Sequence, residues 1–319
     1  GAGTVELKDP FTVSDSLRIK AASLVLHTNL TLRNGLVFNS NSLDGVKNLT
    51  NYGRLELGGT SELATRSGGR LTSVNNSGQM LAFNHIVKTE YFENSGGIIS
   101  TQYTLSSLTN FCYSTVQPIT NTAPSIGSIN VDALVAKLDG GTLYTSGDAV
   151  LSGNVWKMNR SSVNLGGALN INIQQVLTDN GLGSSNMVSV NDGFTLAASE
   201  SIGGSLLGTH VLSSAAKFNF IDHIWGVPNR GASVASFADS VPIGVLELNM
   251  EDGTARMNFK GTGANRALYV DVLRISGGVT DGLTLAKFLA SVKVDPNLTI
   301  YFADIQSTNS SVLATVNAE

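Results

Sequence analysis

The sequence predicts an all-β fold, a parallel β-solenoid in which one chain winds into stacked coils. Three observations support this fold class: a turn phrase that recurs in the N-terminal part, short apolar alternations between those turns, and few helix signals. The composition agrees, since 34 of the 319 residues are glycine, about 11% compared with about 7% in an average protein. Apolar residues make up 42% of the chain, so it can bury a core.

The recurring turn phrase places asparagine two residues before glycine, with an apolar residue on either side of the turn. The steps from residue 51 to 76 and from 76 to 94 are each close to one coil of a solenoid. We expect the asparagine amides to stack, because like amides in adjacent coils can hydrogen-bond to one another. We expect the glycines to supply the positive φ at which the chain bends. The predicted structural turn residues are Asn51, Asn76, Asn94, Gly53, Gly78 and Gly96.

An antiparallel sandwich or propeller is the competing fold. It would need two-residue hairpin turns, and Asp-Gly pairs that suit such turns stand at 44–45, 139–140, 192–193, 252–253 and 281–282. The solenoid is favoured because the expected strands are short and the turn phrases recur in phase. We expect a right-handed coil, since parallel crossovers between strands of one sheet usually have that hand.

The chain is expected to divide near residue 234, with a parallel β-solenoid over 1–234 and a small α+β capping element over 235–319. A cap is expected because an open coil edge exposes unpaired backbone groups. The cap has four expected elements, each predicted from strand alternation, helical spacing or an Asp-Gly turn. They are a hairpin over 241–259 around Asp252-Gly253, a strand over 267–275, a helix over 281–292 and a strand over 298–305.

The charge and cysteine content exclude several classes of function. The chain carries 24 acidic and 20 basic residues, a net charge of −4, so we expect no nucleic-acid groove, which needs clustered lysine and arginine. A single cysteine cannot form a disulfide framework or a cysteine-rich metal site. No segment approaches the roughly 18 apolar residues that cross a bilayer, so we expect no membrane insertion.

No catalytic, metal or cofactor motif stands out in the sequence. The four histidines form no His-x-x-x-His pair. Neither a phosphate-binding Gly-x-x-x-x-Gly-Lys loop nor a Gly-x-Ser-x-Gly turn occurs. We therefore predict no catalytic residue, no metal site and no cofactor.

The densest polar and aromatic cluster of the sequence lies between Phe218 and Trp225. Aromatic faces and carboxylates together suit sugar binding or acid–base chemistry on a polysaccharide. A glycan-binding site is therefore hypothesised at Asp222, His223 and Trp225. The alternative interpretation is a structural Asp–His pair in a loop packed by aromatic side chains. Trp156 likewise has two interpretations, core packing or an exposed stacking platform.

The N-terminal turn phrases, residues 49–55, 74–80 and 92–98, resemble the Asn-x-Gly turns of filamentous-haemagglutinin and autotransporter passenger β-helices. The C-terminal phrases 261–271 and 295–303 resemble segments of very large bacterial surface proteins built from β-helices. The resemblance implies export, an extracellular or cell-surface location, and an architectural or adhesive role. It brings no catalytic motif, so it implies no active-site residue.

The predicted function is that of a noncatalytic extracellular or cell-surface β-solenoid that acts as a structural spacer or an adhesin. Its partners would be host or environmental surface glycans or proteins. The alternatives are a polysaccharide-degrading enzyme and a glycan-binding module without turnover, each built on a β-helix. Because the chain begins Gly1-Ala2-Gly3 without methionine, we also expect a processed product or a piece of a longer protein.

Overall fold

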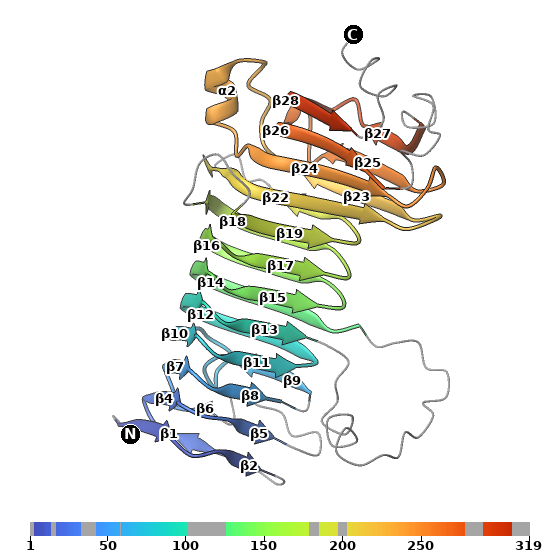
Figure 1. The fold of residues 1–319 in the computed structure, drawn as a ribbon. Helices are drawn as coiled ribbons and strands as arrows, with labels where there is room; N and C mark the ends of the chain where they lie inside the picture. The colour runs from blue at the N-terminus through green and yellow to red at the C-terminus, as the bar shows by residue number, and fades with distance from the viewer. Residues whose placement is uncertain are drawn as a thin grey trace. The chain divides into compact units, whose positions relative to one another are not determined.

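The computed structural model describes residues 3–13, 17–32, 43–57, 59–100, 126–178, 185–196, 203–277 and 290–307. The chain divides into two compact units, residues 1–154 and 155–319. In each unit, parallel strands form two sheets, here called sheet A and sheet B, and successive coils add strands to both (Figure 1). The parallel pairing confirms the predicted all-β solenoid and contradicts an antiparallel sandwich or propeller.

In the first unit, the strands of each sheet follow chain order. Sheet A contains β1 (Thr4–Leu7), β4 (Ser23–Leu26), β7 (Asn48–Asn51), β10 (Leu71–Asn76), β12 (Asn84–Asn94), β14 (Ser128–Asp139) and the start of β16 (Ala149–Asn159), with β9 (Thr60–Leu63) paired to β12. Sheet B contains β2 (Phe11–Val13), β5 (Leu30–Leu32), β8 (Arg54–Glu56), β11 (Gln79–Ala82), β13 (Gly97–Ser100) and β15 (Thr142–Thr145). A small separate sheet pairs β3 (Ile19–Lys20) with β6 (Leu43–Asp44).

The second unit is built in the same way. Its sheet A contains β18 (Leu169–Thr178), β20 (Phe194–Leu196), β23 (Phe220–Trp225), β25 (Arg256–Gly261) and β27 (Val292–Val294), with β21 (Gly203–Gly204) paired to β18. Its sheet B contains β17 (Ser162–Leu165), β19 (Asn186–Val190), β22 (Leu206–Ala215), β24 (Ile243–Met250), β26 (Arg266–Ser276) and β28 (Leu298–Ser307). A short helix, α2 (Val234–Ala238), follows β23, and the hydroxyl of Ser233 caps its N-terminus.

Alternation along each strand sorts the side chains between the core and solvent. In β10, Val74 and Asn76 are buried, whereas Asn75 between them is partly exposed. Adjacent strands are in register, so Val74 pairs with Leu49 on one side and with Phe92 on the other. All three of these apolar side chains are buried. The core is therefore a set of apolar columns that continue from coil to coil at the strand spacing of about 4.8 Å.

The predicted stack of asparagines is present where the chain turns from sheet A to sheet B. Asn51, Asn76 and Asn94 are each at most 1% exposed. Nδ2 of Asn51 donates to Oδ1 of Asn76 at 2.8 Å, and Nδ2 of Asn76 donates to Oδ1 of Asn94 at 2.7 Å. These two amides also donate to backbone carbonyls in the next coil, those of Gln79 at 3.1 Å and Gly97 at 3.2 Å. The side chains thus join three coils through a chain of buried hydrogen bonds.

The turn glycines allow close approach between coils, and the expected reason for them, a positive φ, is wrong. None of Gly53, Gly78 and Gly96 has a positive φ. A Cβ on Gly78 would overlap the carbonyl oxygen of Gly53, and a Cβ on Gly96 would overlap that of Gly78. The backbones lie so close because the amide of Gln79 donates to the carbonyl of Gly53 at 2.9 Å.

The C-terminal hairpin expected over 241–259 is wrong. Strand β24 pairs in parallel with β22 and β26 in sheet B, whereas β25 pairs in parallel with β23 and β27 in sheet A. The turn at Asp252-Gly253 therefore joins the two sheets within one coil. Asp252 holds this turn by accepting a hydrogen bond from the backbone amide of Thr254 at 2.8 Å.

The other expected C-terminal elements have mixed outcomes. The strands predicted over 267–275 and 298–305 are confirmed as β26 and β28. Most of the helix predicted over 281–292 lies outside the described residues, and its last residue, Val292, begins β27. The division of the chain into a solenoid and a cap at residue 234 stays a prediction, as does the right-handed coil. Sheet B of the second unit continues across this position, because β22 pairs with β24.

Replacing Asn76 with alanine tests the amide stack. The change removes one accepted and two donated hydrogen bonds and leaves buried polar groups of Asn51, Asn94 and Gly97 short of a partner. Because an unpaired buried polar group costs roughly 1–3 kcal/mol, we expect Asn76→Ala to lower the free energy of unfolding by about 3–5 kcal/mol. Chemical denaturation followed by circular dichroism measures the difference.

The matched control is Asn75→Ala, on the outer face of the same strand. We expect this variant to change the free energy of unfolding by less than about 0.5 kcal/mol, as surface substitutions usually do. Equal stabilities of the two variants would show that the amide stack does not hold the coils together.

Candidate functional site

The three residues of the predicted glycan site do not share a face of the structure. They lie on β23, where alternation directs Asp222 outward and His223 and Trp225 into the core. His223 is 4% exposed and Trp225 is 2% exposed, so neither can serve as a platform for a sugar. The hypothesis of a joint site at Asp222, His223 and Trp225 is therefore wrong, because only Asp222 faces solvent. Trp156 is fully buried as well, which confirms the packing interpretation.

His223 is a neutral core residue with both ring nitrogens engaged. Nδ1 accepts a hydrogen bond from the backbone amide of Phe194 at 3.2 Å, so the ring proton is on Nε2, which lies 3.1 Å from the hydroxyl of Ser213. The ring stacks on Phe259 in the next coil, with centroids 4.7 Å apart. Burial lowers the pKa of His223 to about 4, so the ring is uncharged at neutral pH.

Asp222 is hydrogen-bonded to the neighbouring strand on the outer face of sheet A. Its carboxylate accepts hydrogen bonds from Lys260 at 2.6 Å and from Asn258 at 2.9 Å, both on the neighbouring strand β25. The hydrogen bond from Lys260, followed by that from Asn258, lowers the pKa of Asp222. The group is therefore an ionised partner in a cross-strand pair, which does not suit it to donate a proton in catalysis.

A second buried histidine lies in the first unit. His85 donates from Nε2 to the carbonyl of Ile99 at 3.1 Å, because a carbonyl can only accept. Burial lowers the pKa of His85 to about 4, as it does for His223. Both units thus hold a histidine as an uncharged interior group.

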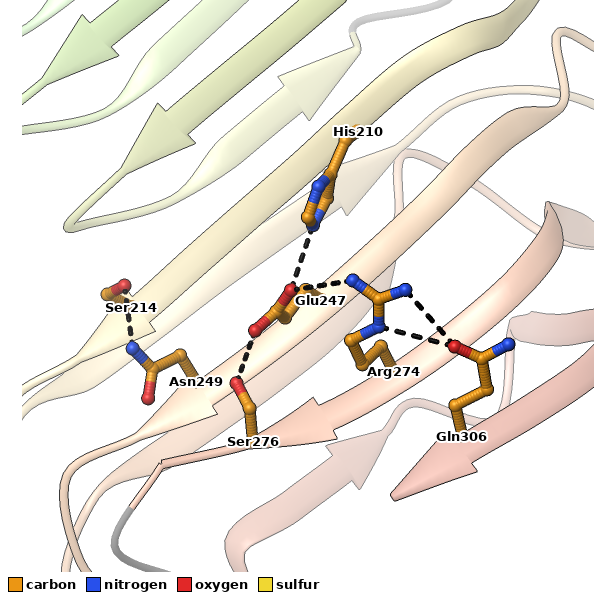
Figure 2. Close-up of polar contacts among 7 residues, drawn as sticks. All are labelled: His210, Ser214, Glu247, Asn249, Arg274, Ser276 and Gln306. Atoms are coloured by element: carbon orange, nitrogen blue, oxygen red, sulfur yellow. Dashed lines mark hydrogen bonds and ion pairs between the residues drawn. The ribbon is translucent and has the colours of Figure 1, made fainter. Parts of the chain in front are cut away.

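A cluster of polar side chains crosses the outer face of sheet B in the second unit (Figure 2). We call it the polar ladder, and it consists of His210 on β22, Glu247 on β24, Arg274 on β26 and Gln306 on β28. Glu247 is its centre, since its Oε2 lies 2.9 Å from Nε2 of His210 and 3.4 Å from Nη1 of Arg274. Ser276 donates to the other carboxylate oxygen at 2.6 Å.

Arg274 carries the polar ladder on to the last strand of the sheet. Its Nη2 donates to Oε1 of Gln306 at 3.1 Å, so four neighbouring strands are joined in one network. Burial raises the pKa of Glu247, but the hydrogen bond from Ser276 and the interactions with His210 and Arg274 outweigh it, and the net change is downward. The carboxylate therefore stays ionised.

The polar ladder binds strands together and lacks the geometry of a nucleophilic site. Both carboxylate oxygens of Glu247 accept hydrogen bonds, and Oε2 also pairs with Arg274, so three neighbouring side chains hold the group in place. Within the described part of the chain, the imidazole of His210 is hydrogen-bonded to this carboxylate and to no hydroxyl nucleophile. The sequence carried no sign of this cluster, because its contacting members are 37, 27 and 32 residues apart.

Among the described residues, no group of three or more histidine, cysteine, aspartate or glutamate side chains is placed to hold a metal ion. None of the helices in the described ranges is long and apolar enough to cross a membrane. No protein-family model matches the chain, and no curated protein or solved structure does so.

The buried histidines predict how stability depends on pH. The unfolded chain protonates a histidine near pH 6.5, whereas folded His223 takes up its proton near pH 4. Between these values the unfolded state binds more protons, so the free energy of unfolding falls as the pH falls, by about 3 kcal/mol for this residue. We expect His223→Gln, which keeps an acceptor and a donor but does not titrate, to remove this part of the decline.

Denaturation curves recorded between pH 7 and pH 4 measure the effect. His27→Gln is the control, because the side chain of His27 is 42% exposed. Any change it makes reports the surface contact with Glu6 at 3.6 Å and not the loss of a buried ring. If the curve of His223→Gln runs parallel to that of the unmodified protein, the ring of His223 is not a neutral interior group.

Proposed function

We propose that this chain is a noncatalytic structural β-solenoid that works outside the cell or on its surface, as a spacer or an adhesin. The observation that carries the proposal is that its charged side chains join neighbouring coils. The pairs Glu93–Lys137, Asp222–Lys260 and Glu247–Arg274 each link adjacent strands of one sheet. These carboxylates, which could otherwise act in catalysis, form ion pairs between adjacent coils.

The interior supports the same proposal. It contains the stacked amides of Asn51, Asn76 and Asn94 and the neutral rings of His85 and His223, all of which are buried. Hydrogen bonds between buried side chains, such as those that join Asn51 to Asn76 and Asn76 to Asn94, favour one register of the coils. A rigid coil whose outer charged side chains are paired with one another suits a spacer. Such a spacer would present binding surfaces to host or environmental glycans or proteins.

Export from the cell is the second part of the proposal. It is supported by the resemblance of the turn phrases at 49–55, 74–80 and 92–98 to those of surface-exposed β-helices. In-register stacking of those three phrases adds to this support. The alternative of a polysaccharide-degrading enzyme loses two of its three proposed residues, because His223 and Trp225 are buried.

Protease treatment of intact source cells tests the location. Proteinase K should degrade the chain, detected with an antibody raised against it, and should spare a cytoplasmic marker. A chain that is protected in intact cells and degraded only after lysis would contradict a surface location.

A turnover assay tests the noncatalytic role. We expect the purified protein to release no reducing ends from a panel of polysaccharides. Release that the substitution Asp222→Asn abolishes would overturn the proposal and establish the enzyme. Asp222→Asn is informative because Asp222 is the exposed carboxylate of the original cluster, with 45% of its side chain accessible.

A further inference from the structure

A groove of about 660 Å³ crosses the turns from sheet B to sheet A in the second unit. Four successive coils each contribute a residue to its lining, namely Gly166, Asn191, Asn219 and Glu251. The volume is within the range of small-molecule sites, about 300–1,000 Å³. Because adjacent strands lie about 4.8 Å apart, four turns span about 14 Å, which suits a linear ligand aligned along the stack.

Two amides and one carboxylate oxygen of the groove are open to a ligand. Asn191 and Asn219 are exposed, and within the described ranges neither side-chain amide hydrogen-bonds to another residue. Glu251 accepts the backbone amide of Lys217 on Oε2 at 3.2 Å, which leaves its other oxygen open. An amide provides donors and an acceptor, and a carboxylate provides acceptors. Neighbouring hydroxyl groups of a sugar can bind to both.

Two aromatic rings lie on either side of Asn219 in the chain and are held in solvent. Phe218 is 72% exposed and Phe220 is 71% exposed. Phe218 has a φ of 59°, in the left-handed region that favours glycine, and its amide donates to the hydroxyl of Thr254 at 3.0 Å. Such a conformation costs roughly 1–3 kcal/mol, so the turn keeps a bulky ring where glycine would be easier. Neither ring is part of the groove lining, but each is the chain neighbour of Asn219, which is. Exposed rings in these positions are available to pack on a sugar chain that extends beyond the groove.

We propose that this groove binds an uncharged polysaccharide, with the rings of Phe218 and Phe220 packing on sugar faces and the amides of Asn191 and Asn219 binding hydroxyl groups. Aromatic faces carry partial negative charge and attract the polarised C–H groups of a sugar ring. An acidic glycan is disfavoured, because three acidic residues, Asp192, Glu251 and Asp252, outnumber two basic ones, Lys217 and Arg256, at these turns. This inference rests on the proposed adhesive function and names its ligand class.

Affinity electrophoresis of the purified protein tests the proposal. The gels contain soluble starch, galactomannan or xyloglucan as uncharged probes, and polygalacturonate as the acidic probe. We expect at least one uncharged polysaccharide to retard the protein and polygalacturonate to leave it unretarded. Retardation by polygalacturonate alone, or by no probe, overturns the proposal. The protease assay on intact cells tests the cell-surface location separately, so the two proposals can fail independently.

Four variants assign the binding to the groove. Phe220→Ala and Asn219→Ala should each weaken retardation at least tenfold. Phe218→Gly should do the same while keeping the thermal unfolding midpoint, because glycine accepts the positive φ without strain. Tyr144→Ala, which removes a 44% exposed ring in the first unit, is the control and should bind like the unmodified protein. Unchanged retardation of Phe218→Gly and Asn219→Ala would show that the groove is not the binding site.

Discussion

Backbone hydrogen bonds between one coil and the next are the interaction on which the rest of this structure depends. They fix parallel neighbours in register, so each residue lies over its counterpart in the coil before it. Three features follow from that register. They are the apolar columns, the stack of Asn51, Asn76 and Asn94, and the close approach between the backbones of turn glycines in adjacent coils. The stack also has defined ends, because Leu26 pairs with Asn51 and Leu138 pairs with Asn94, and both leucines are buried.

The same register decides where chemistry can occur. Inward positions are buried, so His85 and His223 are held uncharged there. Outward positions on neighbouring strands lie close enough for ion pairs, as Glu247 and Arg274 show. At the turns from sheet B to sheet A, the side chains of Asn191 and Asn219 make no such pair among the described residues. That difference explains why the candidate glycan groove, with Asn219 in its lining, runs over the turns instead of over a sheet.

Much of the fold could be predicted from the sequence, because the phase of Asn51, Asn76 and Asn94 reports the coil directly. The hairpin at Asp252-Gly253 was wrong because an Asp-Gly turn fits both a hairpin and a turn between sheets. The glycan hypothesis failed because neighbours in a strand, such as Asp222 and His223, face opposite sides. The polar ladder could not be predicted, since coils of unequal length hide which residues meet.

Disulfide trapping tests the in-register stacking most directly. Thr50 and Asn75 are paired on adjacent strands, and both lie on the outer face. In a Cys112→Ser background, we expect Thr50→Cys/Asn75→Cys to form a disulfide on mild oxidation, because Cα atoms of paired residues lie within bridging distance. Thr50→Cys/Ser73→Cys, shifted by two residues to roughly 8 Å, should not. Equal cross-linking of the two pairs, or none in the first, would contradict the stacking.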